Sequence, residues 1–520
     1  MSALKSAKPA TWAALPNNIS AGYWWRDPGL LSCNLTLAAY IFIQATGGYD
    51  KSLMNNLQAF PSFQDLVDHP SSSALGLITA SMSFGTLLSA PFFGWFSDKV
   101  GRRICMASGA ALMLVGAILQ AAANNRELFI AGRVIIGLGV SGTLAAGPLL
   151  VQEIAHPRHR AVYSAFYNTL WYVGSTICAW LSFGTSFMSN DWSWRIPCIG
   201  QAVPAAFTLC VVYWLPESPR WLVKHGKEEE AHNLLAKFHA NGKMDDELVM
   251  YEMTEIKEAL AVEAAIPSRG FFGDWQHLFG TPANRKRMLV VTWFVLGIDW
   301  CGTSIVSYYL VRILDSVGVT GTTEQTAING GLQVFNIITA MSGAMLAERF
   351  GRRKLWLVSF IGMLLVNVPF GACSALYAKY GNLAAGKAVI ALSYLYQGTY
   401  NLGCNPLPYL YAPELFPLRT RARAMGYEVA LDAAMGVLGQ YVTPIQLEAW
   451  AWKTYFFYTA LLAVWIIGIW AFFPETKGMT LEEIADIFGD GADKVEQLRV
   501  QAVTKADGSA EGDSKSDFKV

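Results

Sequence analysis

The sequence predicts an all-α membrane protein in which a unit of six transmembrane helices occurs twice. Three observations lead to this fold class: long apolar runs, charges gathered between those runs, and a charged motif repeated at matched places in the two halves. Of the 520 residues, 53% are hydrophobic and only 15% are charged, whereas soluble proteins carry about 25% charged residues. The formal net charge is zero, so no bulk attraction to nucleic acid is expected.

About twelve apolar runs have the ~20 residues that a helix needs to cross the ~30 Å hydrocarbon core of a bilayer. We therefore expect each run to be a transmembrane helix, with lipid as the surrounding solvent. The runs lie near residues 29–49, 73–96, 104–123, 127–152, 162–184, 195–215, 287–311, 324–347, 354–378, 385–412, 423–446 and 453–473.

A repeated loop pattern divides the chain into two halves, 29–215 and 287–473. DKVGRR follows the second run and ERFGRR follows the eighth, and an acid precedes an arginine by seven residues after both the fourth and the tenth run. Parallel repeats of this kind are a transporter architecture. We interpret the acids and arginines as cytosolic gates within each half; the alternative is a topology signal alone. These residues are Asp98, Arg102, Glu153 and Arg160 in the first half, and Glu348, Arg352, Glu414 and Arg421 in the second.

The remaining regions are polar. Residues 1–28 precede the first run, residues 216–286 suggest amphipathic linker helices, and residues 474–520 form a tail that we expect to be disordered beyond about 490. Basic loops favour the cytosol, which places both termini there. The loops of the other side are expected to carry the isolated basic residues Lys51, Arg126 and Lys453. We expect a multi-pass protein of the plasma membrane.

Signals for other functions are weak. The eight cysteines contain no CxxC pair and the histidines do not cluster, so no metal site is predicted. A GxGxxG match at residues 137–142 falls inside a predicted membrane helix, where small residues favour close helix packing rather than dinucleotide binding. No GxxxxGK[ST] loop occurs, so neither ATP nor another cofactor is expected.

Five motifs resemble the signatures of the sugar porters of the major facilitator superfamily. They are DKVGRR, GRVIIGLG, PESPRW, ERFGRR and PETKG, in that order. WCGTSIVSYYL and NPLPYLYAPE resemble most closely the fungal lactose- and cellodextrin-type permeases. The resemblance implies alternating access, with a sugar bound between the halves near the bilayer midplane. We expect a monomer.

The resemblance also implies a proton site. GGYD, which ends at Asp50, matches the family's first-segment motif, whose aspartate binds the proton in proton-coupled members and is paired with the arginine that is Arg133 here. A carboxylate and a guanidinium within apolar helices need each other, which agrees with this role. The alternative is a permanent structural ion pair.

Sugar hydroxyls both donate and accept hydrogen bonds, so amides and aromatic residues suit them. The resemblance implies such a pocket, with Tyr308 and Tyr309 closing it from outside; for each polar residue the alternative is a hydrogen bond between helices. The other implied pocket residues are Asn168, Ser304, Asn336, Asn401 and Tyr409.

Two pocket positions depart from the family's amides, because Asp299 and Asp432 are acids, and Glu428 lies one turn before Asp432. Three interpretations are open: acceptors for sugar hydroxyls, additional proton sites, or counter-charges for a substrate with a basic group. The alternative for either aspartate is a bond to a neighbouring helix.

The sequence therefore predicts a secondary active transporter, not an enzyme, for a sugar such as an oligosaccharide or glycoside, with proton symport. One alternative is a carrier or exporter of a non-sugar or basic metabolite on the same fold. A non-transporting receptor is a further alternative, but the tail after Pro474 is short for one.

Overall fold

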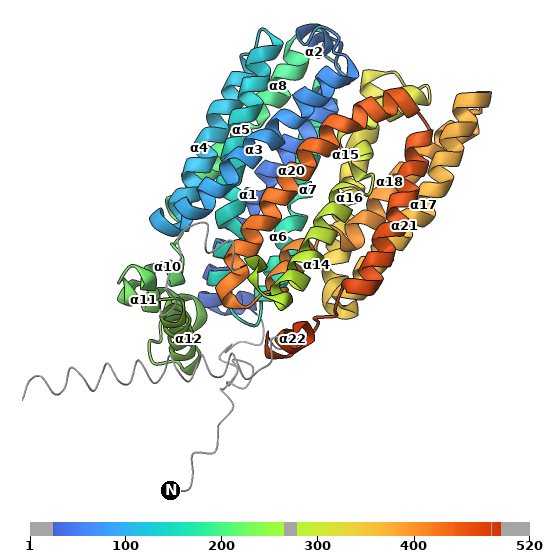
Figure 1. Ribbon diagram of the computed structural model, residues 1–520. Helices are drawn as coiled ribbons and strands as arrows, with labels where there is room; N and C mark the ends of the chain where they lie inside the picture. The colour runs from blue at the N-terminus through green and yellow to red at the C-terminus, as the bar shows by residue number, and fades with distance from the viewer. Residues whose placement is uncertain (1–23, 265–277, 480, 490–520) are drawn as a thin grey trace, which may run out of the picture.

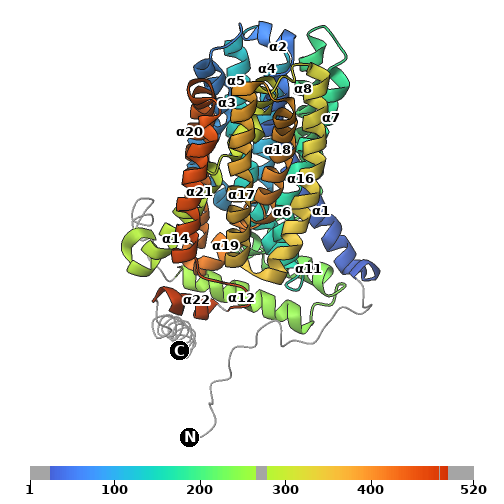
Figure 2. The same cartoon turned by 90° about the vertical axis from the view of Figure 1, so that its right-hand side faces the viewer.

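The protein is an all-helical bundle in the computed structural model, which describes residues 24–264, 278–479 and 481–489. Figures 1 and 2 show long helices lying side by side, with α10, α11, α12 and α22 gathered at one end of the bundle. We call this the linker end, and the opposite end, which carries α2, the far end. All twelve predicted segments are helical, which confirms the twelve-helix fold.

The first half contains six membrane segments, of which the fifth and sixth are each divided into two helices. Its helices are α1 (Pro28–Leu57), α2 (Pro61–Leu66), α3 (Ser72–Val100), α4 (Arg102–Ala121), α5 (Arg126–Ile154), α6 (Arg160–Thr169), α7 (Trp171–Thr185), α8 (Trp192–Gly200) and α9 (Ala202–Val212).

The second half repeats this plan, with divided segments at its beginning and in its fourth segment. Its helices are α14 (Pro282–Asp299), α15 (Thr303–Ser316), α16 (Thr322–Phe350), α17 (Arg352–Tyr380), α18 (Leu383–Gly403), α19 (Pro408–Leu415), α20 (Leu418–Trp450) and α21 (Lys453–Phe472). The other helices are η2 (Trp24–Arg26), α10 (Pro219–Lys224), α11 (Glu228–His239), α12 (Glu247–Ala264) and α22 (Leu481–Phe488).

The helix lengths and surfaces suit a bilayer. Nine helical spans among the described residues are long and apolar enough to cross one. Large apolar side chains such as Leu88, Trp95, Leu365 and Trp470 are exposed on these spans. In water such a surface would be costly, whereas against hydrocarbon it is not.

Glycines let α5 approach its neighbours closely. A Cβ atom on Gly137 would lie 1.9 Å from the carbonyl oxygen of Met82 on α3, and one on Gly139 would lie 2.4 Å from the carbonyl oxygen of Gly109 on α4. Small residues at such contacts let helix backbones meet in membranes. The GxGxxG match therefore serves helix packing within α5.

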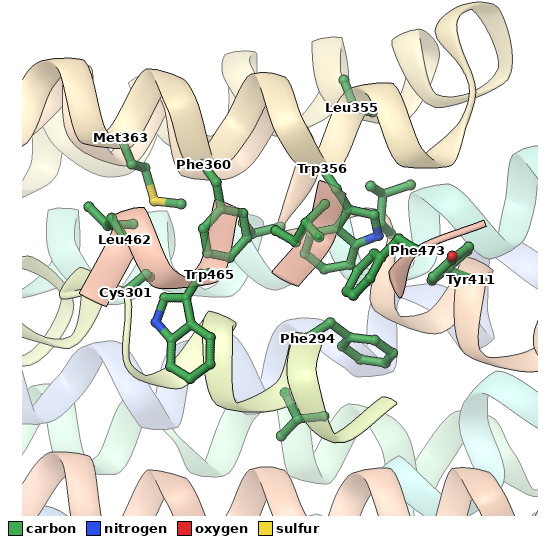
Figure 3. Packing of buried hydrophobic residues seen from close by; sticks show 14 of the residues in the cluster. Phe294, Cys301, Leu355, Trp356, Phe360, Met363, Tyr411, Leu462, Trp465 and Phe473 are labelled. Atoms are coloured by element: carbon green, nitrogen blue, oxygen red, sulfur yellow. The ribbon is translucent and has the colours of Figure 1, made fainter. Parts of the chain in front are cut away.

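The two halves meet along α3 with α20 and along α7 with α16. The second half has its own aromatic core, in which the side chains of α17 point toward those of α14 and α21 (Figure 3). Phe294 and Trp356 stack there with ring centroids 5.6 Å apart. Each half is thus packed internally, and the polar site lies where the halves face each other.

Candidate functional site

Asp50 on α1 is almost completely buried, with 1% of its surface exposed. Its Oδ1 accepts a hydrogen bond from Nε2 of Gln201 at 2.9 Å, and its Oδ2 has no hydrogen-bond partner among the described residues. Gln201 occupies the break between α8 and α9, so the division of the sixth segment brings an amide to the carboxylate. A carboxylate with one unused oxygen is able to accept a proton.

Arg133 on α5 is also buried, with 2% of its surface exposed. Its Nη2 donates to the carbonyl oxygen of Thr79 at 3.4 Å, while its Nε and Nη1 have no hydrogen-bond partner in the described part of the chain. Arg133 attracts Asp50 electrostatically, but the two side chains form no direct ion pair there. The structure thus places Arg133 near Asp50 without a direct ion pair, and the role of the two residues in proton coupling stays a prediction.

A chain of amides joins the halves. The hydroxyl of Tyr172 on α7 donates to Oδ1 of Asn401 at 2.5 Å, and Nδ2 of Asn401 donates to Oδ1 of Asn336 at 3.0 Å. Asn336 then donates to Oε1 of Gln333 at 3.3 Å, and Gln333 donates to Oδ1 of Asn329 at 3.1 Å. The structure therefore brings together the predicted Asn336 and Asn401, and it adds two amides that the sequence reasoning missed.

The same chain continues into α1. Nδ2 of Asn329 donates to Oδ1 of Asn56 at 2.6 Å, and Nδ2 of Asn55 donates to Oδ1 of Asn329 at 3.3 Å. A signal for the missed amides exists in the sequence, because Asn329, Gln333 and Asn336 are spaced by four and three residues and so share one helix face. Polar side chains on one face of a membrane helix point toward protein rather than lipid.

Asn168 lies apart from this chain, toward the linker end. Its Nδ2 donates to the carbonyl oxygen of Asn405 at 2.7 Å, and its Oδ1 accepts from Gln44 at 3.5 Å. Tyr409 packs against Tyr167, with ring centroids 6.2 Å apart. These contacts connect α6 with the α18–α19 region, so Asn168 and Tyr409 each contact a residue of the opposite half, although neither of those partners was predicted.

The paired tyrosines belong to contacts between α15 and the helices around it. The hydroxyl of Tyr309 donates to the carbonyl oxygen of Gln440 at 2.5 Å, and the carbonyl oxygen of Tyr308 accepts from Nε2 of Gln58 at 2.7 Å. Gln58 directly follows α1, so the second contact joins the two halves. This arrangement is compatible with closure of the site from the far end.

Asp299 ends α14, and Gly302, with a φ of +98°, turns the chain into α15. Ser304 donates to the carbonyl oxygen of Asp299 at 3.4 Å, so it stabilises the turn. Asp299 and Asp432 interact electrostatically with each other and with Lys51. The expectation that Lys51 lies in a loop is wrong, because α1 extends to Leu57 and carries Lys51 inside the bundle.

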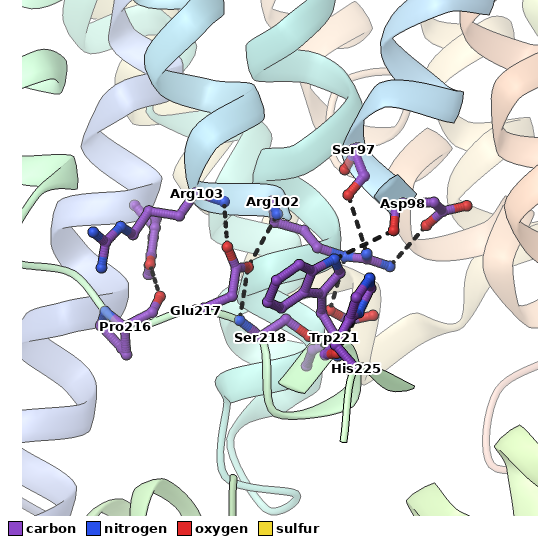
Figure 4. Close-up of polar contacts among 11 residues, drawn as sticks. Ser97, Asp98, Arg102, Arg103, Pro216, Glu217, Ser218, Trp221 and His225 are labelled. Atoms are coloured by element: carbon purple, nitrogen blue, oxygen red, sulfur yellow. Dashed lines mark hydrogen bonds and ion pairs between the residues drawn. The ribbon is translucent and has the colours of Figure 1, made fainter. Parts of the chain in front are cut away.

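Arginines and acids form ion pairs at the linker end of the first half (Figure 4). Arg102 contacts Asp98 at 3.0 Å and Glu153 at 3.5 Å. The carboxylate of Glu217 accepts from the backbone N–H groups of Arg102 and Arg103 at 3.0 and 3.1 Å, which caps the beginning of α4. The sequence predicted that Asp98 and Glu153 would contact Arg160 of α6, whereas in the structure both acids contact Arg102.

The second half repeats this arrangement. Arg352 contacts Glu414 through Nη2 at 2.7 Å and through Nε at 3.2 and 3.1 Å. Glu475 accepts from the backbone N–H groups of Arg352 and Arg353 at 2.8 and 3.2 Å. The side chain of Glu348 lies outside the described residues, so its predicted role stays a prediction.

The two remaining gate arginines differ from the expectation. Arg160 pairs with Glu252 of the linker helix α12 at 3.8 Å rather than with Glu153. Arg421 donates to the carbonyl oxygen of Phe416 at 3.3 Å. Arg160 is the first residue of α6 and Arg421 lies in the first turn of α20, so both side chains are close to loop and linker atoms.

His156 and His239 pack together where the linker helices join the first half, with ring centroids 5.1 Å apart, so the expectation that the histidines do not cluster is wrong for this pair. His239 of α11 is buried between Glu252, whose Oε2 is 2.6 Å from Nδ1, and the carbonyl oxygen of Ile154, which is 3.0 Å from Nε2. Burial alone would lower the pKa of His239, but the Glu252 carboxylate raises it to about 10. Burial lowers the pKa of the neighbouring His156 to about 3, with repulsion from His239 adding to the effect.

Comparison with known proteins agrees with this architecture. The family described as "Sugar (and other) transporter" matches residues 35–488. The chain belongs to this family. A high-affinity glucose transporter of Kluyveromyces lactis is 31% identical over 471 residues, covering 85% of this chain and 82% of that protein. A quinate permease of Neurospora africana is 27% identical over 464 residues, covering 85% and 86%. These relatives are transporters, and this family member is a sugar transporter of the major facilitator type rather than an enzyme.

Solved structures support the transporter fold. The proton:xylose symporter XylE bound to 6-bromo-6-deoxy-D-glucose has a TM-score of 0.74 and 21% sequence identity, covering 88% of this chain and 99% of that chain. A partially occluded inward-open form of the xylose transporter XylE from E. coli has a TM-score of 0.72. At this identity the likeness establishes the fold, and the choice of substrate must come from the site.

Proposed function

We propose that this sugar transporter carries an oligosaccharide or glycoside across the plasma membrane together with a proton, by alternating access between its halves. The observation that carries the proton coupling is the geometry of Asp50. A buried carboxylate with one amide contact, one unused oxygen and an arginine nearby can hold or release a proton without moving far. The symporter among the structural neighbours is consistent with such coupling.

The amide chain supports a polyhydroxylated substrate. Amides and phenols offer both donors and acceptors, as sugar hydroxyls require. These groups bond to one another across the halves, and a sugar whose hydroxyls replaced such bonds would keep the amides satisfied. The preference for an oligosaccharide or glycoside rests on the resemblance of the seventh and tenth segments to lactose- and cellodextrin-type permeases.

The linker end is the cytosolic end in this proposal, because the arginine-rich junctions all lie there. Both termini then lie in the cytosol. Binding residues on α7, α16 and α18 face the interface between the halves, and the arginine–acid contacts at the linker end control access from the cytosol.

Uptake in transporter-deficient yeast tests the proposal. Cells expressing the wild type are given labelled glucose, lactose or cellobiose, with and without a protonophore. We expect accumulation above equilibrium that the protonophore abolishes. Asp50→Asn should remove accumulation while retaining exchange of labelled for unlabelled sugar, whereas Asp65→Asn, which changes an exposed acid on α2, should behave as wild type.

Two results would overturn the proposed function. Accumulation by Asp50→Asn equal to that of the wild type would remove the coupling assignment. Absence of uptake for every sugar, with wild-type protein present at the cell surface, would remove the proposed substrate class.

A further inference from the structure

Four charged side chains form a group that a neutral sugar and a single proton site do not require. We call Lys51, Asp299, Glu428 and Asp432 the central charge cluster. Lys51 comes from α1 in the first half, Asp299 from the end of α14, and the other two acids from α20. Lys51 interacts electrostatically with Asp299 and Asp432, and Glu428 interacts with Asp432.

The cluster lies between the halves rather than toward lipid. The ammonium of Lys51 is 4.9 Å from the ring centroid of Trp171 on α7, in a cation–π contact. Lys51 and the two aspartates are each partly exposed although they lie within the bundle, as expected for groups that line the space between the halves. Glu428 is deeper, with 5% of its surface exposed.

The charges of the cluster do not balance. Three carboxylates face one ammonium, so an excess of negative charge remains when all four groups ionise. The end of α14 adds to this excess, because the last carbonyl groups of a helix carry partial negative charge and favour cations. The site as built is therefore electrostatically suited to one more cation.

Two carboxylate oxygens also lack donors. Oδ2 of Asp299 and Oε2 of Glu428 are buried and have no hydrogen-bond partner among the described residues. A buried acceptor without a donor is costly. An ammonium group on the substrate would supply both the missing charge and several N–H donors.

A metal ion is a weaker candidate for this cation. No group of three His, Cys, Asp or Glu side chains in the described ranges is arranged to hold one. The acids are spread over two helices. Lys51, which interacts with the two aspartates, contacts Trp171, and Trp171 directly precedes the Tyr172 that bonds to the amide chain. This placement suits a larger molecule that carries hydroxyls at one part and a cationic group at another.

We propose that the central charge cluster binds a protonated amino group of the substrate, so that the transporter prefers an amino sugar or an amino-bearing glycoside to its neutral analogue. This proposal rests on the proposed function and specifies its substrate class. Asp299, Glu428 and Asp432 receive the amino group, and Lys51 competes with it for the same carboxylates. The amide chain binds the hydroxyls.

Uptake of labelled glucosamine, N-acetylglucosamine and glucose by the full-length protein in transporter-deficient yeast tests the proposal. Glucosamine and its N-acetyl derivative differ chiefly in the charged amine. We expect the wild type to have a kcat/KM for glucosamine at least about tenfold above that for N-acetylglucosamine, the size of one charge-assisted contact. Asp299→Asn with Asp432→Asn should reduce this ratio to near one, whereas Asp65→Asn on α2 should leave it unchanged. Lys51→Gln should raise the ratio.

Folding is checked separately by thermal unfolding of each purified variant in detergent, and Glu428→Gln provides a second, smaller change. Equal kcat/KM values for glucosamine and N-acetylglucosamine in the wild type would overturn the proposal about the amino group. If the same cells still accumulated glucose, the proposed sugar transport would stand. The proposal would also be overturned if the double variant Asp299→Asn with Asp432→Asn kept the wild-type ratio of the two kcat/KM values. The same holds if that variant changed only the number of protons transported per sugar.

Discussion

The linker ends of the two halves have the same backbone design and different side-chain contacts. In both, a glycine with positive φ, Gly101 or Gly351, turns the chain sharply between two membrane helices. In both, a glutamate from after the last segment of that half, Glu217 or Glu475, caps the helix that begins there. A Cβ atom on Gly101 would lie 2.4 Å from Oε2 of Glu217, so the glycine and the cap require each other.

The arginine contacts distinguish the halves. Arg352 forms a close pair with Glu414, whereas Arg102 shares its guanidinium between Asp98, whose side chain is 56% exposed, and the more distant Glu153. The first half is instead attached to the linker helices through Glu252, which contacts Arg160 and His239. The two halves therefore share the turn and the cap, and they differ in the distance between the arginine and its glutamate and in the attachment to the linker helices.

The largest difference should follow removal of the two arginines. We expect Arg352→Ala to lower the free energy of unfolding by about 3 kcal/mol, since it removes the arginine that pairs with the partly buried carboxylate of Glu414. Arg102→Ala should cost about 1 kcal/mol, because one of its partners is well exposed. Thermal unfolding in detergent measures both, with the exposed Arg349→Ala as control. An equal loss in the two halves would contradict the asymmetry.

The two glutamate caps should contribute about equally to stability. Glu217→Gln and Glu475→Gln each weaken charge-assisted bonds to two backbone N–H groups at a helix start, and we expect each to cost about 1–2 kcal/mol. The same unfolding assay compares them. A large effect in one half with none in the other would show that the backbone designs are not equivalent.

The smallest expected effect is a change with pH in how firmly the linker helices α11 and α12 dock against the first half. The raised pKa of His239 provides stability that is complete below its unfolded value near 6.5 and is lost as the pH rises toward about 10. The lowered pKa of His156 acts in the opposite direction, so stability is lost as the pH falls from about 6.5 toward 3. Docking of α11 and α12 should therefore be strongest near pH 6.5.

Hydrogen exchange of the α11 and α12 amides across this pH range measures docking. His239→Gln should flatten the alkaline side of the profile, and His156→Gln the acidic side. The beginning of α20 serves as the internal control in the second half. A monotonic profile in the wild type would contradict the opposing shifts.

Much of the architecture follows from the sequence alone. Apolar runs of bilayer length predicted all twelve segments, because hydrocarbon requires continuous helices or closed barrels. The repeated DKVGRR and ERFGRR loops predicted the two halves and placed Arg102 and Arg352 at equivalent turns. These features depend on local composition and spacing, which a sequence displays directly.

The contacts of the site were harder to predict. Arg133 was expected to pair with Asp50, and it does lie near it, but the hydrogen bond to the carboxylate comes from Gln201 at the break between α8 and α9, which the sequence did not indicate. Lys51 was assigned to a loop because its run of apolar residues ended just before it, while α1 continues through a polar stretch that is buried between the halves. Such contacts depend on how distant helices pack, and hydropathy carries no information about that.

The close contact of α4 with α5 gives experiments on this protein an internal reference. Where Gly109 and Gly139 bring the two backbones together, neither helix can rotate or slide without collision. Spectroscopic labels at the exposed Ile118 of α4 and Ala131 of α5 should therefore keep a constant separation throughout the transport cycle. Labels at Leu88 of α3 and Leu438 of α20 span the two halves, so a change in their distance, measured against that constant one, would report the motion between them.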